Sequence, residues 1–165
     1  AAAHAAGAGI QAIVDGLTSM RAVTGRLEVR SAHAGARMID DSYNANPASL
    51  RAGLRALTSI PGRHWLVLGE MRELGPASAQ LHAEMGEFAR QTGVARLLAV
   101  GDDAHHAVEA FGTGATWFAS VDDMIAALRA ELGPDVTVLV KGSRSNRLER
   151  VSAALASAAA AGTGH

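Results

Sequence analysis

Cysteine is absent from this chain of 165 residues, and long apolar stretches are absent as well. Without cysteine, a disulfide framework and thiolate metal sites are excluded, and the composition suits a reducing cytosol. A bilayer span needs about 20 consecutive apolar residues, so we expect no membrane span. The start of the chain has no basic leader, and its composition indicates a helix rather than a signal peptide.

An excess of positive charge is also missing. The formal net charge of −1 offers no general attraction to phosphate backbones, so we expect no nucleic-acid partner. Hydrophobic residues make up 48% and charged residues 19%, which is sufficient for a sizeable core. The length indicates one domain, with room for a fragment of a neighbour. The chain has no initiating methionine, and we expect it to be a piece of a longer protein.

The common phosphate-binding and zinc-binding signatures are missing too. Neither Gly-x-Gly-x-x-Gly nor Gly-x-x-x-x-Gly-Lys-Ser/Thr occurs, so another part must hold most of the phosphates of any nucleotide. The seven histidines do not have zinc-site spacing: His105 and His106 are adjacent, and His82 stands alone. We expect His82 to be a packed or capping residue rather than a ligand.

Short apolar strands alternate with amphipathic helices over most of the chain. Strands are expected at residues 26–32, 36–41, 64–70, 96–103, 116–119 and 136–144. Helices are expected at residues 10–20, 47–57, 81–88, 105–111, 121–132 and 148–155. Strands that are apolar on both faces predict an α/β fold, with a mostly parallel sheet covered by helices on both faces.

Polar residues follow the expected strands where those strands end. Gly69, Gly101 and Gly142 stand at three of these ends, where glycine lets backbone or ligand approach closely. The polar residues there are Asp40, Asp41, Glu70, Asp102, Asp103, Lys141, Ser143 and Arg144. Ligands of such sheets bind beyond the carboxyl ends of the strands, so this edge is the predicted site.

The segment VKGSR combines a strand end, a glycine turn and two cations. If Ser143 caps a following helix, the helix start together with Lys141 and Arg144 forms a pocket for a carboxylate or phosphate. The alternative is ordinary capping, with both cations paired to surface acids. The residues alone leave these two interpretations equally open.

The segment IDDSYNANP follows the second expected strand. Alternation along the strand sends Asp40 and Asp41 to opposite faces, so only one of them is expected to reach a site. An aspartate at such a position can accept both hydroxyls of a ribose. The alternative is an Asn/Asp-rich turn that only caps the next helix. We expect Glu73, in a later loop, to be structural.

Five motifs in order resemble the C-terminal domain of the Mur ligase family. They are GRLE (25–28), DDSYNANP (40–47), LGEMRELG (68–75), LH (81–82) and KGSR (141–144). The resemblance implies a Rossmann-like domain at residues 25–160. It also implies closing helices of the family's central ATPase domain and a linker at residues 1–24, and a frayed tail at residues 161–165.

The resemblance implies ATP-dependent amide-bond synthesis in cytoplasmic peptidoglycan assembly. The family activates the carboxylate of a UDP-N-acetylmuramoyl peptide as an acyl phosphate, which an incoming amine attacks. The motifs look most like the branch that adds D-Ala-D-Ala to the tripeptide. By resemblance, the ATP-binding residues are Arg26 (phosphate), Asp41 (ribose), Asn44 and Asn46. The residues expected to bind the amino substrate are Lys141, Ser143 and Arg144.

What the family needs in addition is missing from these motifs. The resemblance places the phosphate loop and the Mg²⁺ ligands in the central domain, and UDP recognition in the N-terminal domain. We therefore expect no catalytic or metal-binding residue here, and no turnover by this chain alone. Two alternatives remain: a sibling ligase that adds another amino acid, and a free-standing Rossmann-like binding module.

Overall fold

The computed structural model describes residues 28–156, which form a six-stranded sheet with helices on both faces. The strands are β1 (Glu28–Ser31), β2 (Arg37–Asp41), β3 (Arg63–Gly69), β4 (Arg96–Val100), β5 (Ala115–Phe118) and β6 (Val136–Lys141). The α-helices are α3 (Pro47–Thr58), α4 (Ser78–Gln91), α5 (Ala104–Phe111), α6 (Val121–Glu131) and α7 (Glu149–Leu155). Three short 3₁₀ turns are η1 (His33–Gly35), η2 (Gly75–Ala77) and η3 (Arg144–Asn146).

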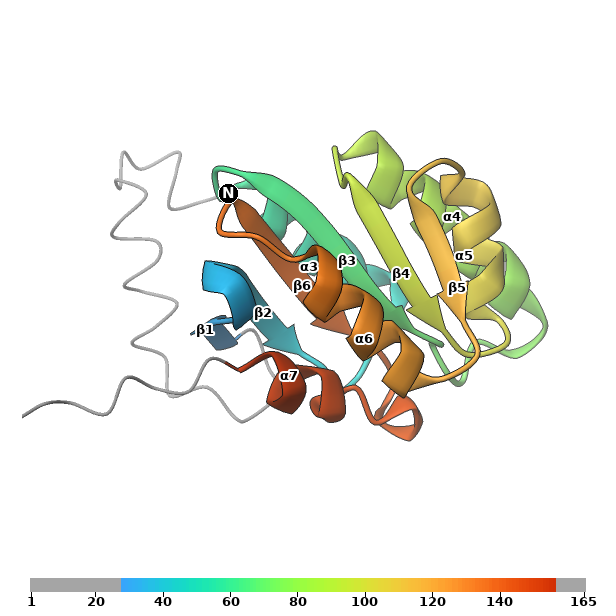
Figure 1. The fold of residues 1–165 in the computed structure, drawn as a ribbon. Coiled ribbons are helices and arrows are strands. Elements are labelled where there is room, and N and C mark those ends of the chain that lie inside the picture. Colours follow the sequence, from blue (N-terminus) through green and yellow to red (C-terminus); the bar gives the residue numbers. More distant parts are fainter. Residues whose placement is uncertain (1–27, 157–165) are drawn as a thin grey trace, which may run out of the picture.

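The sheet has the strand order β1-β2-β6-β3-β4-β5, and β1 is its one antiparallel strand. The predicted α/β fold with a mostly parallel sheet is therefore confirmed (Figure 1). The expected helix at residues 10–20, the linker and the expected tail at residues 161–165 lie outside the described residues.

The helices divide between the two faces according to the direction in which the chain crosses the sheet. The connections through α3, α4 and α5 all run toward β5, and residues of these helices share one core cluster. The connection through α6 runs back from β5 to β6, and α6 and α7 belong to the cluster on the opposite face (Figure 1). Right-handed crossovers require this change of face when the direction reverses.

Helix α3 begins at a strong local start signal. Asn46 is its N-cap, with its side chain accepting from the Ser49 N–H at 2.8 Å, and Pro47 occupies the first turn. Leu50, Leu54 and Leu57 are completely buried against the sheet. Each such leucine contributes about 1.5–3 kcal/mol relative to an exposed side chain.

Helix α4 is rotated relative to the expected apolar face. The sequence placed Leu81, Met85 and Phe88 on the buried side, whereas Leu81 and Phe88 are only half-buried. His82 and Gly86 are buried instead. A Cβ on Gly86 would lie 2.0 Å from the carbonyl oxygen of Ala107 in α5. The absence of a side chain at Gly86 thus lets α4 and α5 approach closely, and this contact sets the rotation.

Reversal of the chain direction makes β6 the topological switch point of the sheet. Strands β2 and β3 flank β6, and the chain continues from them into α3 and α4 on one face of the sheet. From β6 it continues into α7 on the other face. Ligands of open α/β sheets bind where adjacent strands part in this way. The carboxyl ends of β2, β6 and β3 are therefore the expected place of a ligand site.

Candidate functional site

Asp41 and Lys141 lie side by side at the carboxyl ends of β2 and β6. They are paired residues in the parallel register, and both share the sheet face of Ile39 and Leu139. The Lys141 ammonium donates to Asp41 Oδ2 at 2.5 Å and to the Asn44 carbonyl oxygen at 3.0 Å. The Lys141 side chain is 2% exposed and that of Asp41 is 13% exposed. The fold therefore brings the two expected binding segments together.

Asp40 points to the opposite face, as the alternation predicted. Its side chain lies on the same face of the sheet as that of Met38, which belongs to the α6–α7 core cluster. Asp40 is buried, and its carboxylate accepts from the Ser42 N–H at 3.2 Å. This aspartate shapes the turn after β2, whereas Asp41 is the one at the switch point.

The loop between β2 and α3 presents exposed amides and an exposed aromatic ring. Asn44 accepts from the Ala45 N–H with its side chain at 2.8 Å, in addition to its backbone bond with Lys141. Asn46 accepts from Ser49 and caps α3. Asn44, Asn46 and Tyr43 are exposed. The capping interpretation of this loop is thus correct, and its exposed amides remain accessible to a ligand.

Ser143 does not have the capping role that the sequence indicated. It stands at the N-cap position of η3, but its side chain makes no capping bond. Its hydroxyl oxygen instead accepts from the Arg72 N–H at 2.9 Å, and its own N–H donates to the Glu70 carbonyl at 3.3 Å. The capping prediction was wrong because a long-range partner, the loop after β3, takes the hydroxyl.

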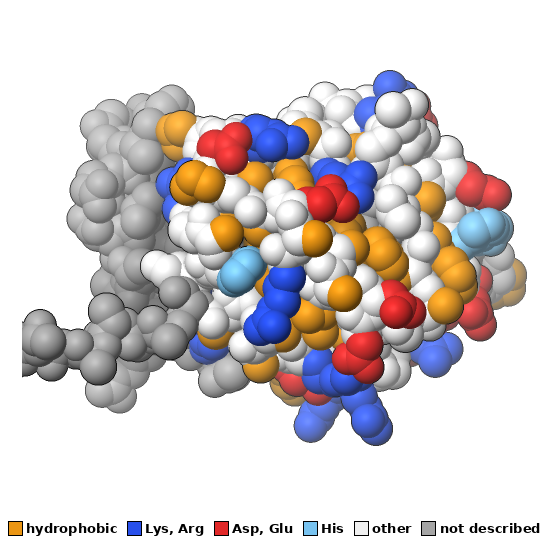
Figure 2. Space-filling view, in the orientation of Figure 1, with side chains coloured by type: hydrophobic (Ala, Val, Ile, Leu, Met, Phe, Trp, Pro, Cys, Tyr) orange, Lys and Arg blue, Asp and Glu red, His pale blue; other side chains and the backbone are white. Residues whose placement is uncertain are grey.

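Lys141 and Arg144 do not form one exposed cationic surface. Lys141 is buried on the α3 face, whereas Arg144 is exposed on η3, along the path to α7. Lys and Arg side chains with acidic neighbours gather at the lower edge of the α6–α7 face (Figure 2). Among exposed cations near the switch point, Arg72 contacts Glu70 at 3.6 Å and the Ser145 hydroxyl at 3.4 Å.

Asn146 is the residue of this region that sequence reasoning missed. Its side-chain amide donates to the Glu70 carbonyl at 2.7 Å and to the Ser143 carbonyl at 3.0 Å. A Cβ on Gly69 would lie 2.8 Å from the Asn146 side chain, and one on Gly101 would lie 3.4 Å from its oxygen. The glycines at the strand ends were the available signal, and here they admit the protein's own amide.

The ends of β3 and β6 are consequently closed by protein. A Cβ on Gly142 would lie 2.9 Å from the Gly69 Cα, so the two backbones nearly touch. Asn146 fills the neighbouring space above Gly69. The other boundary of β6, with β2, carries the Asp41–Lys141 pair beside the exposed amides of the β2–α3 loop.

His82 is the packed residue that the sequence predicted. It is fully buried; its Nε2 accepts from the Met71 N–H at 2.9 Å, and its Nδ1–H donates to the Ser78 carbonyl at 2.8 Å. The histidine thereby holds the loop after β3 against α4. Glu73 in this loop is exposed and adopts φ 64°, in the left-handed region that serves turns.

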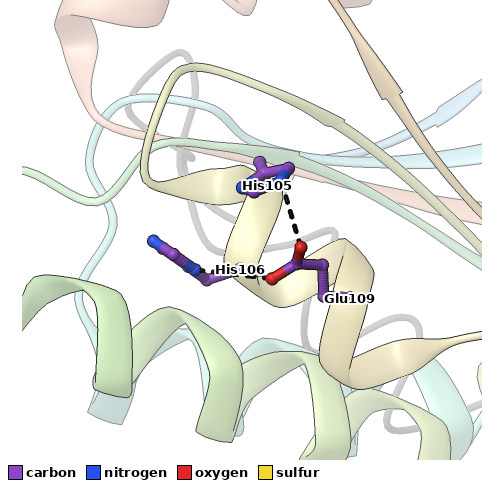
Figure 3. Close-up of side chains that lie close together, drawn as sticks. All are labelled: His105, His106 and Glu109. Carbon is purple, nitrogen blue, oxygen red and sulfur yellow. Dashed lines mark ion pairs between the residues drawn. The ribbon is translucent and has the colours of Figure 1, made fainter.

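His105, His106 and Glu109 of α5 form the group of possible metal ligands found among residues 28–156 (Figure 3). Glu109 lies 3.2 Å from the His105 Nε2 and 3.6 Å from the His106 Nδ1. Mg²⁺ prefers six oxygen ligands, so two imidazoles and one carboxylate do not fit it. The group is solvent-facing, and its contacts are those of ion pairs along one helix.

Together these features define a class: an α/β domain with a parallel sheet whose accessible polar groups lie at the carboxyl-end switch point. The family described as "Mur ligase, glutamate ligase domain" matches residues 25–144. The chain belongs to this family.

Similar proteins agree with the family assignment. The UDP-N-acetylmuramoyl-tripeptide–D-alanyl-D-alanine ligase of Escherichia coli is 40% identical over 90% of this chain and 33% of its own length. The ligase of the same name from Mycobacterium tuberculosis (strain CDC 1551 / Oshkosh) is 38% identical over 90% of this chain and 34% of its own length. The chain thus spans about a third of the length of the curated relatives that it matches.

Solved structures resemble the fold closely. The MurF ligase of Thermotoga maritima, in complex with ADP, superposes with a TM-score of 0.73 and 26% identity. That match covers 93% of this chain and 35% of the other. The Acinetobacter baumannii MurF structure gives a TM-score of 0.72 and 32% identity over 92% of this chain and 34% of its own.

Two expectations lie partly outside what the structure tests. Arg26 precedes the described residues, and so do the closing helices and linker expected at residues 1–24.

Within residues 28–156, no helix has the length and apolar character that crossing a membrane requires.

Proposed function

We propose that this chain is the C-terminal domain of an ATP-dependent ligase that joins D-Ala-D-Ala to UDP-N-acetylmuramoyl-tripeptide in cytoplasmic peptidoglycan synthesis. The observation that carries the proposal is the meeting of Asp41 with the Lys141–Arg144 loop at the switch point. Relatives at 38–40% identity carry the name of this ligase, which favours this branch over a sibling ligase.

Each binding segment has a part in the proposed reaction. The Asp41 carboxylate accepts hydrogen bonds from the ribose, and the exposed amides of Asn44 and Asn46 border the nucleotide. Arg26 reaches a phosphate from the linker. The exposed Arg144, beside Ser143, receives the carboxylate of the incoming dipeptide by a charge-assisted bond.

The cofactors are ATP and Mg²⁺. The ADP complex of the Thermotoga relative supports nucleotide use. Because the described residues bring together no oxygen-rich metal group, Mg²⁺ and the β- and γ-phosphates are assigned to the remaining domains. Mg²⁺ neutralises the charge that develops during phosphoryl transfer. This chain contributes orientation of the nucleotide and the amine.

The proposal is tested with the full-length enzyme, UDP-N-acetylmuramoyl-tripeptide and ATP. Phosphate release is expected with D-Ala-D-Ala. The rate of release is expected to be about a hundredfold lower with D-glutamate or meso-diaminopimelate, because a single amino acid leaves polar groups of a dipeptide-binding site without hydrogen-bond partners. A preference for one of the single amino acids would contradict the proposed branch.

The 165-residue chain alone serves as the companion measurement. Under the same conditions it is expected to release no phosphate above background, because the main electrostatic stabilisation of the transferred phosphoryl group is missing. Turnover by this chain would show that its own residues hold the metal and the phosphates, against the division of roles proposed above.

A further inference from the structure

We propose that Lys141 is a positioning residue for the nucleotide side of the site and not a contact for the amino substrate. This inference rests on the proposed function and deepens it. It assigns to Lys141 the task of fixing the Asp41 carboxylate and the Asn44 carbonyl relative to the sheet. It differs from the role that the family resemblance gave this lysine.

Burial is the first argument. Lys141 as a whole residue is 1% exposed, and its side chain is among the largest fully buried side chains of the described residues. Its stem lies under α3, since a Cβ on Gly53 would come within 3.9 Å of the Lys141 Cδ and 3.1 Å of a Leu139 methyl group. The lysine stem thus lies between β6 and α3, and almost none of the residue is presented to a ligand in solution.

The partners of the ammonium are the second argument. Both of its recorded bonds go to protein oxygens, Asp41 Oδ2 and the Asn44 carbonyl. A substrate carboxylate at this nitrogen would sit beside the Asp41 carboxylate, and two like charges in a buried place repel strongly. Arg144 is exposed and forms no ion pair with a carboxylate of residues 28–156, so it is the better anion ligand.

The connection to the nucleotide follows from what Lys141 holds. Asp41 ends β2, and Asn44 lies midway to the cap of α3. By binding both, Lys141 fixes the first half of the β2–α3 loop and leaves Asp41 with one carboxylate oxygen free of this lysine. A ribose hydroxyl then meets an acceptor that is already oriented, which avoids the entropy cost of ordering it on binding.

Hydrogen exchange in the full-length enzyme without substrates tests the positioning directly. In Lys141→Met, the amides of residues 42–46 are expected to exchange about tenfold faster than in the wild type, because the loop loses its anchor to β6. In Arg144→Met, which removes an exposed cation of the same segment, exchange of these amides is expected to stay unchanged. Unchanged exchange in Lys141→Met would overturn the proposal.

Steady-state kinetics then separate the two roles. Lys141→Met is expected to raise the KM for ATP about tenfold and to leave the KM for D-Ala-D-Ala within about twofold, while Arg144→Met gives the reverse. A rise confined to the KM for D-Ala-D-Ala in Lys141→Met would overturn the proposal. If the wild-type enzyme is inactive with these substrates, the proposed function fails, and the exchange experiment decides the positioning role alone.

Lys141→Arg keeps the experiment decisive should the methionine variant not fold. Arginine retains the charge that a carboxylate ligand needs but is longer and planar, so it does not reproduce the lysine geometry between Asp41 and Asn44. The positioning role predicts a raised KM for ATP and faster loop exchange in this variant. A normal KM for ATP with normal loop exchange would contradict it.

Discussion

At the scale of single residues, the two adjacent aspartates show how position divides chemistry. Asp40 is buried and supports the turn through Ser42, while Asp41 is partly exposed beside Lys141. Both have the same side chain, and the alternation of β2 alone separates them. This separation was predictable from the sequence because it depends only on strand parity.

Asparagine substitutions distinguish the two aspartates in the full-length enzyme. Asp41→Asn is expected to raise the KM for ATP about ten- to a hundredfold, since a charged hydrogen bond to the ribose is weakened. Asp40→Asn is expected to leave the KM for ATP within about twofold and to lower the free energy of unfolding by about 1–2 kcal/mol. Initial rates and urea unfolding provide the measurements, and equal KM values for both variants would contradict the assignment.

The partner of Asp41 was not predictable in the same way. Lys141 is a hundred residues away in sequence, and its pairing with Asp41 depends on β6 lying beside β2. The segment VKGSR alone left an anion pocket and ordinary capping equally open, and only the family resemblance assigned Lys141 to the amino substrate. No local pattern in the sequence indicates that the Lys141 side chain is buried against α3.

At the scale of elements, local signals located the helices and strands well. The cap at Asn46, Pro47 and the leucine spacing define α3 within a few residues. The rotation of α4 was missed because it depends on contact with α5 at Gly86, a long-range feature. The same limit applies to Ser143 and Asn146, whose partners lie in the loop after β3.

Two buried helical glycines provide a matched test of that packing. Gly86→Ala is expected to lower the free energy of unfolding by about 2–3 kcal/mol, because its Cβ would collide with the Ala107 backbone in α5. Gly53→Ala is expected to change it by less than about 1 kcal/mol, because a gain in helix propensity offsets contact with a movable Leu139 methyl group.

Urea unfolding of both glycine variants measures the difference. Circular dichroism of the folded baselines confirms that helix content is retained. Equal losses in Gly86→Ala and Gly53→Ala would contradict the view that backbone contact at Gly86 sets the position of α4 on α5.

At the scale of the whole molecule, one reversal of chain direction creates the site. Three crossovers run toward β5 on one face, and the fourth returns to place β6 between β2 and β3. The sequence predicted a parallel sheet with functional ends, but strand order is decided by long-range pairing and did not follow from local patterns. The order explains why polar side chains from the two ends of the described chain meet at β2 and β6.

The site is half of what the proposed reaction requires. It offers a fixed carboxylate, exposed amides and an exposed arginine. Binding of the metal and the phosphates is assigned to the remaining domains of the full-length enzyme, since this chain spans about a third of the length of its relatives. Closure of domains around a nucleotide completes sites of this kind and excludes water.

The most direct test of this account is the structure of the full-length enzyme bound to a non-hydrolysable ATP analogue. The account predicts a ribose hydroxyl within about 2.5–3.2 Å of the Asp41 carboxylate, with Lys141 still bound to Asp41 and Asn44. A bound analogue whose ribose makes no contact with the β2–α3 loop would contradict it.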